Sequence, residues 1–140
     1  MSVWLLDTGP LVAYLDAGDP QHRAVRRCLD GFSGRLVTTS AVITEAMHLA
    51  AADSRGPRLV ADFMAEAGVE SYDFTRPAEL RDAVSLMERY RNLPMDYADA
   101  TLLLLAEALD VADLLTLDRR GFAAFRTQDG QALRLVLDLA

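Results

Sequence analysis

Short apolar runs alternate with longer amphipathic stretches along almost the whole chain. Five runs have the length and composition of strands, at residues 2–6, 35–39, 69–74, 112–117 and 133–139. Helical spacing of apolar positions marks the stretches between them, at 10–15, 21–30, 41–52, 58–67, 78–91 and 96–109, with a short piece at 121–126. Strands that alternate with helices need crossover connections, so the pattern predicts an α/β fold with a mostly parallel central sheet covered on both faces.

Proline and cap residues mark where these elements begin. Pro10, Pro20 and Pro57 each fall in the first turn of a predicted helix, where the missing N–H of proline costs nothing. Ser40 is predicted to cap the helix at 41–52, and Pro94 separates the last two long helices. No repeat, linker or low-complexity tract interrupts the pattern, so we expect a single domain over residues 1–140.

The composition narrows the class of protein. The chain has 140 residues, 51% of them hydrophobic, which is enough for one core in one domain. The apolar runs are short and carry charges, and the N-terminus has no basic leader, so we expect neither a membrane span nor a signal peptide. Cys28 is the only cysteine, which favours a reducing compartment. These features together predict a cytoplasmic protein.

The charge argues against several functions. The net charge is −7, and all 14 basic residues are arginine. Without lysine the chain cannot form a Schiff base or a phosphate-binding P-loop. An acidic chain is also an unfavourable starting point for binding nucleic acid, because phosphate contacts need positive charge nearby. A nucleic-acid substrate therefore requires local cations.

Two predicted strands end at a carboxylate. Asp7 follows the run at 2–6, and Asp118 follows the run at 112–117. In open parallel sheets, ligands bind beyond the carboxyl ends of the strands. We therefore expect both acids at one edge of the sheet, in a position to share a ligand.

Three further acids lie on helices that could reach this edge. Glu45 lies beside the apolar stripe of its helix; the alternative is a solvated residue at the edge of that stripe. Asp96 and Asp99 are three residues apart at a helix start, so both can face the same side. Asp96 is equally well explained as the N-cap, with Asp99 in the first turn, where the helix dipole favours a carboxylate.

Four acids that lie close together would repel one another strongly, so something must offset their negative charge. If Asp7, Glu45, Asp99 and Asp118 lie about 6 Å apart, their six pairwise repulsions sum to roughly 15 kcal/mol at an effective dielectric near 20. This rivals the whole stability of a domain, about 5–15 kcal/mol. Such a group must hold protons or cations. Ligands that are oxygen atoms alone select hard ions, Mg²⁺ or Mn²⁺.

Four segments, in this order and spacing, resemble the PIN-domain family, and more narrowly its VapC-like toxin ribonucleases: "LLDTGPLVAYLD", "TTSAVITEAMHL", "PMDYADATLLLLAEAL" and "LLTLDRRGFAAF". The resemblance spans nearly the whole chain. It implies a three-layer α/β/α sandwich with a mostly parallel sheet, and endoribonuclease activity that depends on Mg²⁺ or Mn²⁺. It also implies an RNA substrate, a cognate antitoxin and a homodimer.

The resemblance assigns roles to the acids. Asp7, Glu45, Asp99 and Asp118 match the catalytic, metal-binding acids of the family, and Asp96 matches an additional acid in one form of the motif. The implied mechanism is metal-assisted hydrolysis without attack by the 2′-hydroxyl, so the products should carry a 5′-phosphate. The chain departs from the family where it has Leu102–Leu105 in place of small residues after Asp99.

Four more residues are candidates for supporting roles. Thr8 and Ser40 could hold waters or the phosphate. Arg119 and Arg120 follow Asp118 and could contact substrate phosphate, or they could be surface arginines that close a turn.

A rival hypothesis is a catalytically silent PIN-like module that binds RNA or protein. Such a module would be expected to lack one or more of the acids, and all four are present. The pair Glu45 and His48 has the spacing of half a di-iron site, but the sequence contains only one such pair.

Overall fold

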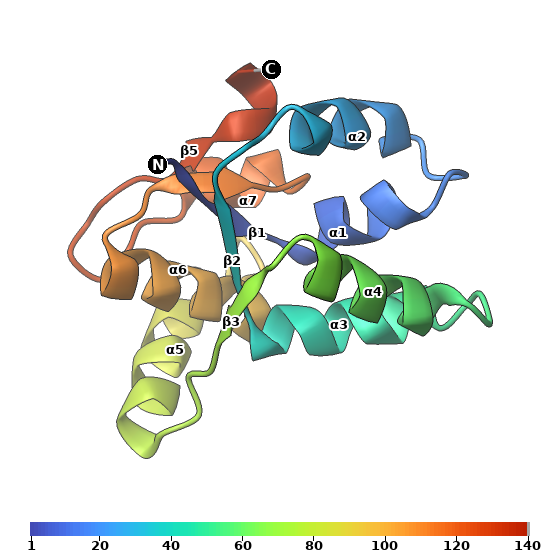
Figure 1. Cartoon of the computed structure of the whole chain (residues 1–140). Helices are drawn as coiled ribbons and strands as arrows, with labels where there is room; N and C mark the ends of the chain where they lie inside the picture. Colours follow the sequence, from blue (N-terminus) through green and yellow to red (C-terminus); the bar gives the residue numbers. More distant parts are fainter. Residues whose placement is uncertain (140) are drawn as a thin grey trace.

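A computed structural model describes residues 1–139 and has a five-stranded sheet at its centre (Figure 1). The strand order is β3-β2-β1-β4-β5, and every neighbouring pair is parallel, which confirms the predicted parallel sheet. The strands are β1 (Val3–Leu6), β2 (Arg35–Thr39), β3 (Glu70–Tyr72), β4 (Asp113–Leu115) and β5 (Arg134–Leu135). The first strand in the chain is thus the central one.

Helices cover both faces of this sheet and complete a three-layer α/β/α sandwich (Figure 1). One layer contains α1 (Thr8–Leu15), α2 (His22–Asp30), α3 (Ser40–Ala50) and α4 (Gly56–Glu66). The other contains α5 (Pro77–Arg89), α6 (Tyr97–Leu109) and α7 (Arg119–Ala124). This arrangement confirms the predicted fold class.

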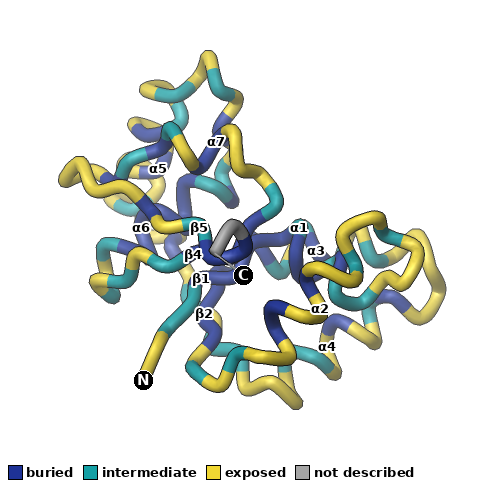
Figure 2. The backbone as a smooth tube through the Cα atoms, turned by 90° about the horizontal axis from the view of Figure 1, so that it is seen from above, coloured by how far each residue is buried: buried dark blue, intermediate teal, exposed yellow. Residues whose placement is uncertain are grey.

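The hydrophobic core has one part on each side of the sheet. Leu5 and Leu114 belong to the part under α5, α6 and α7, while their neighbours Leu6 and Leu115 belong to the part under α1 to α4. Alternate residues of a strand point to opposite faces, so each strand contributes to both parts. Figure 2 shows the buried residues concentrated along the sheet, with exposed residues on the outer turns.

Helix α6 is buried on nearly all sides. Leu102–Leu105 are at most 6% exposed, because α6 packs between the sheet, α5 and α3. Four consecutive leucines would leave an apolar face in water on an ordinary surface helix. The bulk that departs from the family pattern therefore fills the core and does not crowd the helix start, where Asp99 lies.

Two predictions about element ends are wrong. The last strand extends only over Arg134–Leu135 and continues as a 3-10 helix, Val136–Leu139. Ser40 does not cap α3, because the side chain of Thr39 accepts the backbone N–H of Val42. Thr39 ends β2 in an extended conformation, which the N-cap position requires.

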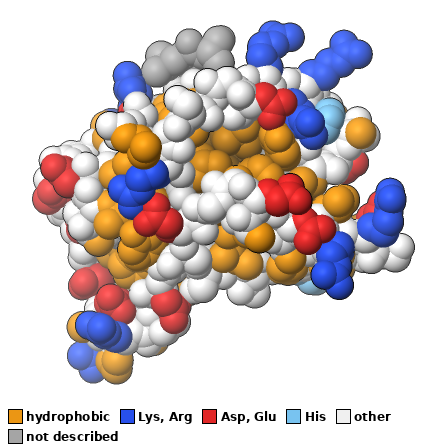
Figure 3. Space-filling view, in the orientation of Figure 1, with side chains coloured by type: hydrophobic (Ala, Val, Ile, Leu, Met, Phe, Trp, Pro, Cys, Tyr) orange, Lys and Arg blue, Asp and Glu red, His pale blue; other side chains and the backbone are white. Residues whose placement is uncertain are grey.

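Hydrophobic and charged side chains share the surface (Figure 3). Hydrophobic side chains are visible between α2 and α4, with acidic and basic residues around them. Among residues 1–139, no helix has both the length and the apolar character needed to cross a bilayer.

Candidate active site

Asp7 lies at the end of the central strand and is almost completely buried. Its backbone N–H donates to the carbonyl of Leu115, and its side chain caps α1 by accepting the N–H of Thr8 at 2.8 Å. Asp7 is only 8% exposed, and its pKa is raised to about 6, with burial as the largest cause. The negative charges of Glu45 and Asp96 add to the rise.

Thr116 holds the other oxygen of this carboxylate. Its hydroxyl donates to Oδ2 of Asp7 at 2.7 Å. Leu6 pairs with Leu115 across the two strands, so the residue after each lies at the same level. Thr116 was not among the hydroxyl residues predicted from the sequence, because the pairing of β1 with β4 that brings it to Asp7 is set by the fold. The sequence does contain a signal for it. Thr116 lies at the end of β4, the strand that pairs with β1, and Asp7 lies at the end of β1.

Asp96 and Asp99 form a capping box at the start of α6. Oδ1 of Asp96 accepts the N–H of Asp99 at 2.8 Å, and Oδ2 of Asp99 accepts the N–H of Asp96 at 3.1 Å. Asp96 is therefore the N-cap, as one of the two alternatives predicted. The box fixes both carboxylates at the mouth of a buried helix.

The carboxyl group of Asp99 lies in an environment that disfavours its charge. Its pKa is raised to about 8, by burial first and then by the charges of Asp96 and Asp7. The pKa of Glu45, half-buried on α3, is also raised, by burial first and then by the charge of Asp96. The structure thus brings Asp7, Glu45, Asp96 and Asp99 into one electrostatic group, which we call the acid group.

Asp118 is not among the charges that raise the pKa of Asp7, Glu45 or Asp99. Its side chain caps α7 by accepting the N–H of Gly121 at 3.1 Å, and it is exposed. Its backbone N–H donates to the hydroxyl of Thr116, which in turn donates to Asp7. Asp118 therefore reaches the acid group through a hydrogen-bonded threonine, while its carboxylate faces its own helix.

The remaining candidates occupy different positions. The hydroxyl of Thr8 is buried beside Asp7 and has no hydrogen-bond partner among residues 1–139. The hydroxyl of Ser40 donates to Asp73 at 2.7 Å, which directs it toward the loop after β3. Arg119 and Arg120 are exposed at the start of α7, and Arg120 lines a hollow of about 300 Å³ together with Asp118.

The acid group fits a hydrated hard cation. All of its donors are carboxylate oxygens, which is the chemistry that Mg²⁺ and Mn²⁺ prefer. In the part of the chain that the structure describes, no three His, Cys, Asp or Glu residues are arranged to enclose a metal ion. Mg²⁺ does not need such a cage, because it commonly binds through one or two carboxylates and keeps several waters. The unpartnered hydroxyl of Thr8 offers such a water an acceptor.

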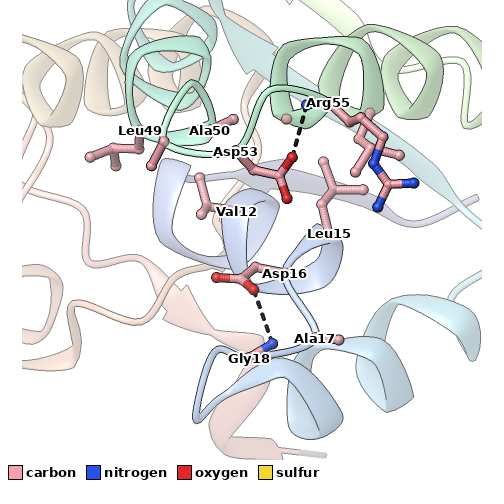
Figure 4. Close-up of a pocket in the computed structure, with 12 residues that line it drawn as sticks. Val12, Leu15, Asp16, Ala17, Gly18, Leu49, Ala50, Asp53 and Arg55 are labelled. Atoms are coloured by element: carbon pink, nitrogen blue, oxygen red, sulfur yellow. Dashed lines mark hydrogen bonds between the residues drawn. The ribbon is translucent and has the colours of Figure 1, made fainter.

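A separate hollow lies at the opposite end of α1 from Asp7 (Figure 4). It has a volume of about 430 Å³ and lies between the end of α1 and the turn that joins α3 to α4. Leu15 and Leu49 give it an apolar lining, and the side chains of Asp16 and Asp53 bond to local backbone N–H groups. It contains none of the acid group, so it is not part of the candidate active site.

The fold and the acid group together define a class. A parallel α/β sandwich with clustered carboxylates beyond its strand ends is typical of proteins that bind divalent cations for phosphate chemistry.

Sequence comparison gives the family. A model of the PIN domain matches residues 4–127. Ribonuclease VapC26 of Mycobacterium tuberculosis is 32% identical over 128 residues, which cover 90% of this chain and 94% of that protein. The chain therefore belongs to the PIN-domain family and, within it, to the VapC-like proteins.

Solved structures share the fold. VapC20 of M. tuberculosis, a Sarcin-Ricin loop cleaving toxin, has a TM-score of 0.73 and 20% identity, covering 87% of this chain and 95% of that one. A toxin–antitoxin complex from Klebsiella pneumoniae has a TM-score of 0.62 and 20% identity, covering 86% and 90%. VapBC2 from Rickettsia felis, bound to a DNA fragment from their promoter, has a TM-score of 0.61 and 14% identity, covering 88% and 92%.

Proposed function

We propose that this protein is a divalent-metal-dependent endoribonuclease that hydrolyses RNA phosphodiester bonds and is the toxin of a toxin–antitoxin pair. One observation carries the proposal: Asp7, Glu45, Asp96 and Asp99 form one acid group in a chain of the PIN-domain family. The 32% identity to a ribonuclease over nearly the full length supports the activity.

The raised pKa values support a site that is built for a cation. Asp7 and Asp99 both resist ionisation, and no positive charge of the described residues contributes to the pKa of either one. A bound Mg²⁺ or Mn²⁺ would remove that penalty, lower the pKa of a coordinated water and stabilise charge on the departing oxygen. We assign Asp7 and Asp99 as the main ligands, with Glu45 and Asp96 completing the site directly or through water.

Other residues of the chain position these ligands. The hydroxyl of Thr116 and the N–H of Thr8 each hold one oxygen of Asp7, so the carboxylate cannot rotate freely. The hydroxyl of Thr8 accepts from a water beside Asp7. Asp118 acts at the rim of the site, where Arg119 and Arg120 offer positive charge to substrate phosphate.

Ser40 has a smaller part in this scheme than the sequence suggested. Its hydroxyl already donates to Asp73, so it can only accept from a water or from the substrate.

The family resemblance extends the proposal to partners. We propose that a cognate antitoxin blocks the site, that the protein forms a homodimer, and that it acts in the cytoplasm as a single domain. Two of the solved structures that share this fold are toxin–antitoxin complexes, which supports the antitoxin. A silent binding module is disfavoured because binding alone would give no reason to retain buried acids whose charge is so costly.

RNA cleavage by the purified protein tests the proposal. Wild type, Asp7→Asn and Asp99→Asn are compared with Mg²⁺, with Mn²⁺ and with chelator, and the ends of the products are mapped. We expect metal-dependent cutting by wild type alone, with 5′-phosphate ends. Undiminished cutting by either variant, or 2′,3′-cyclic phosphate ends, would contradict the proposed site.

A further inference from the structure

An open groove of about 560 Å³ lies beside the acid group, between the first half of α3 and the start of α6. Glu45 and Asp96 belong both to this groove and to the acid group, so the two are continuous. Tyr97 also lines the groove. Its volume is within the range of small-ligand sites, about 300–1,000 Å³. A nucleotide next to the scissile phosphate would therefore meet this groove.

The hydroxyl groups of the groove already donate hydrogen bonds to other atoms of the protein. Ser40 donates to Asp73 at 2.7 Å, Thr75 donates to Asp73 at 3.2 Å, and Thr44 donates to the carbonyl of Ser40 at 3.0 Å. Since a hydroxyl has one hydrogen and two lone pairs, each of these groups can offer a ligand only an acceptor.

The other polar groups add to this bias. The hydroxyl of Tyr97 donates to the carbonyl of Phe74 at 2.7 Å, so it too can only accept from a ligand. His48 is the exception, because a neutral imidazole has one donor and one acceptor. The few polar groups of this largely apolar groove are thus mostly acceptors.

The lining of the groove favours a nucleobase over a phosphate. No arginine is among the groove-lining residues in the described part of the chain, so a phosphodiester finds no guanidinium partner there. The ring of Tyr97 provides a face on which a base can stack. A neutral, flat ligand with polar edges fits these conditions.

We infer that this groove binds an unpaired nucleobase of the RNA substrate and prefers bases with an exocyclic amino group over uracil. Adenine, cytosine and guanine each present an NH₂ donor to the acceptors of the groove. Uracil presents two carbonyl acceptors and one N–H. Its carbonyl oxygens would therefore face acceptor oxygens of the groove and form no hydrogen bond with them. The inference rests on the proposed ribonuclease function and adds to it a reason for sequence preference at one position.

The sequence profile of cleavage tests this inference. Wild type is incubated with a random-sequence RNA library, and the cut sites are sequenced. We expect uracil to be depleted roughly three- to tenfold at one position next to the cut, the ratio expected for one mismatched hydrogen bond.

A substitution in the groove should change the base preference. Thr44 is exposed, so Thr44→Lys keeps the fold while it replaces an acceptor with a donor. We expect Thr44→Lys to reduce or invert the depletion of uracil at that position only. Ser85→Lys, on exposed α5, adds the same charge elsewhere and should keep the wild-type profile. Equal use of uracil by wild type, or identical profiles of the two lysine variants, would overturn the inference.

Binding separates this inference from the proposed function. The Asp7→Asn protein is titrated with fluorescein-labelled rA6, rC6 and rU6. Tighter binding of rA6 and rC6, by roughly three- to tenfold, supports the groove even if wild type cuts no RNA, which would contradict only the nuclease. Equal binding of all three would overturn the preference whether or not wild type cuts RNA.

Discussion

Asp7 and Asp118 follow two neighbouring parallel strands, yet their side chains differ in burial and in hydrogen-bond partners. Asp7 is buried, bonded by Thr8 and Thr116, and belongs to the acid group. Asp118 also caps the helix that follows it, but it is exposed. The register explains the difference: Leu6 pairs with Leu115, so the residue level with Asp7 is Thr116, and Asp118 lies two residues further on.

The comparison shows that the register of strand pairing decides whether an acid at the end of a strand is buried. Its position after an apolar run in the sequence does not. In β1 the acid comes directly after the last paired residue, so the carboxylate remains under the covering helices. In β4 two residues intervene, which is enough to start a turn and bring Asp118 to the surface as an N-cap. A threonine fills the equivalent position and holds the buried acid.

The largest expected effect separates the two acids directly. Asp7→Asn should lower the rate of RNA cleavage on the order of 1,000-fold, because it removes a charge from the proposed ion. Asp118→Asn should lower it less than about tenfold, since asparagine also caps a helix and the carboxylate faces α7. Initial rates at saturating Mg²⁺ check both. Equal losses in the two variants would contradict the distinction.

Thr116 should matter more than Asp118. Thr116→Val removes the hydroxyl that holds Oδ2 of Asp7, and we expect a roughly 10- to 100-fold loss of cleavage. Thr116→Ser keeps a hydroxyl and should recover most of the rate. A rate for Thr116→Val within twofold of wild type would mean that the orientation of Asp7 does not depend on this bond.

The pH dependence of stability should reveal the acid group. Asp7 and Asp99 have folded pKa values of about 6 and about 8, above the ordinary value of 3.8. The folded state therefore binds more protons than the unfolded state between about pH 4 and 8. The free energy of unfolding of the metal-free protein should therefore fall as the pH rises through this window.

Urea unfolding with chelator at pH 5, 6, 7 and 8 measures this slope. The slope should shrink in Asp99→Asn and in the presence of saturating Mg²⁺, because the cation replaces the protons. A metal-free protein whose stability rises with pH over the same range would contradict the acid group.

Substitution of Thr8 should give the smallest effect. It should raise the stability of the metal-free protein and lower the rate of cleavage. Thr8→Val removes a buried hydroxyl that has no partner, so the metal-free protein should gain about 1 kcal/mol of stability. If that hydroxyl accepts from a water beside Asp7, cleavage should fall by about tenfold. Urea unfolding and initial rates check the two signs. Loss of both stability and activity would indicate an ordinary structural bond instead.

The sequence was sufficient for the fold and for most of the acid group. The alternation of apolar strands with amphipathic helices fixes the parallel sandwich, and the spacing of Asp96 and Asp99 places both at the start of α6. Register and cap choice could not be predicted, because they depend on packing between segments far apart in the chain. For that reason Thr116 was missed, and Ser40 was assigned a cap that Thr39 forms.

Binding of Mn²⁺ tests the central claim most directly, because it needs neither a substrate nor turnover. Calorimetric titrations of wild type, Asp7→Asn and Asp118→Asn are compared at pH 7.5. We predict that wild type binds, that Asp7→Asn weakens binding at least tenfold, and that Asp118→Asn stays within about threefold of wild type. Wild-type affinity in Asp7→Asn, or no measurable binding by wild type, would contradict the account.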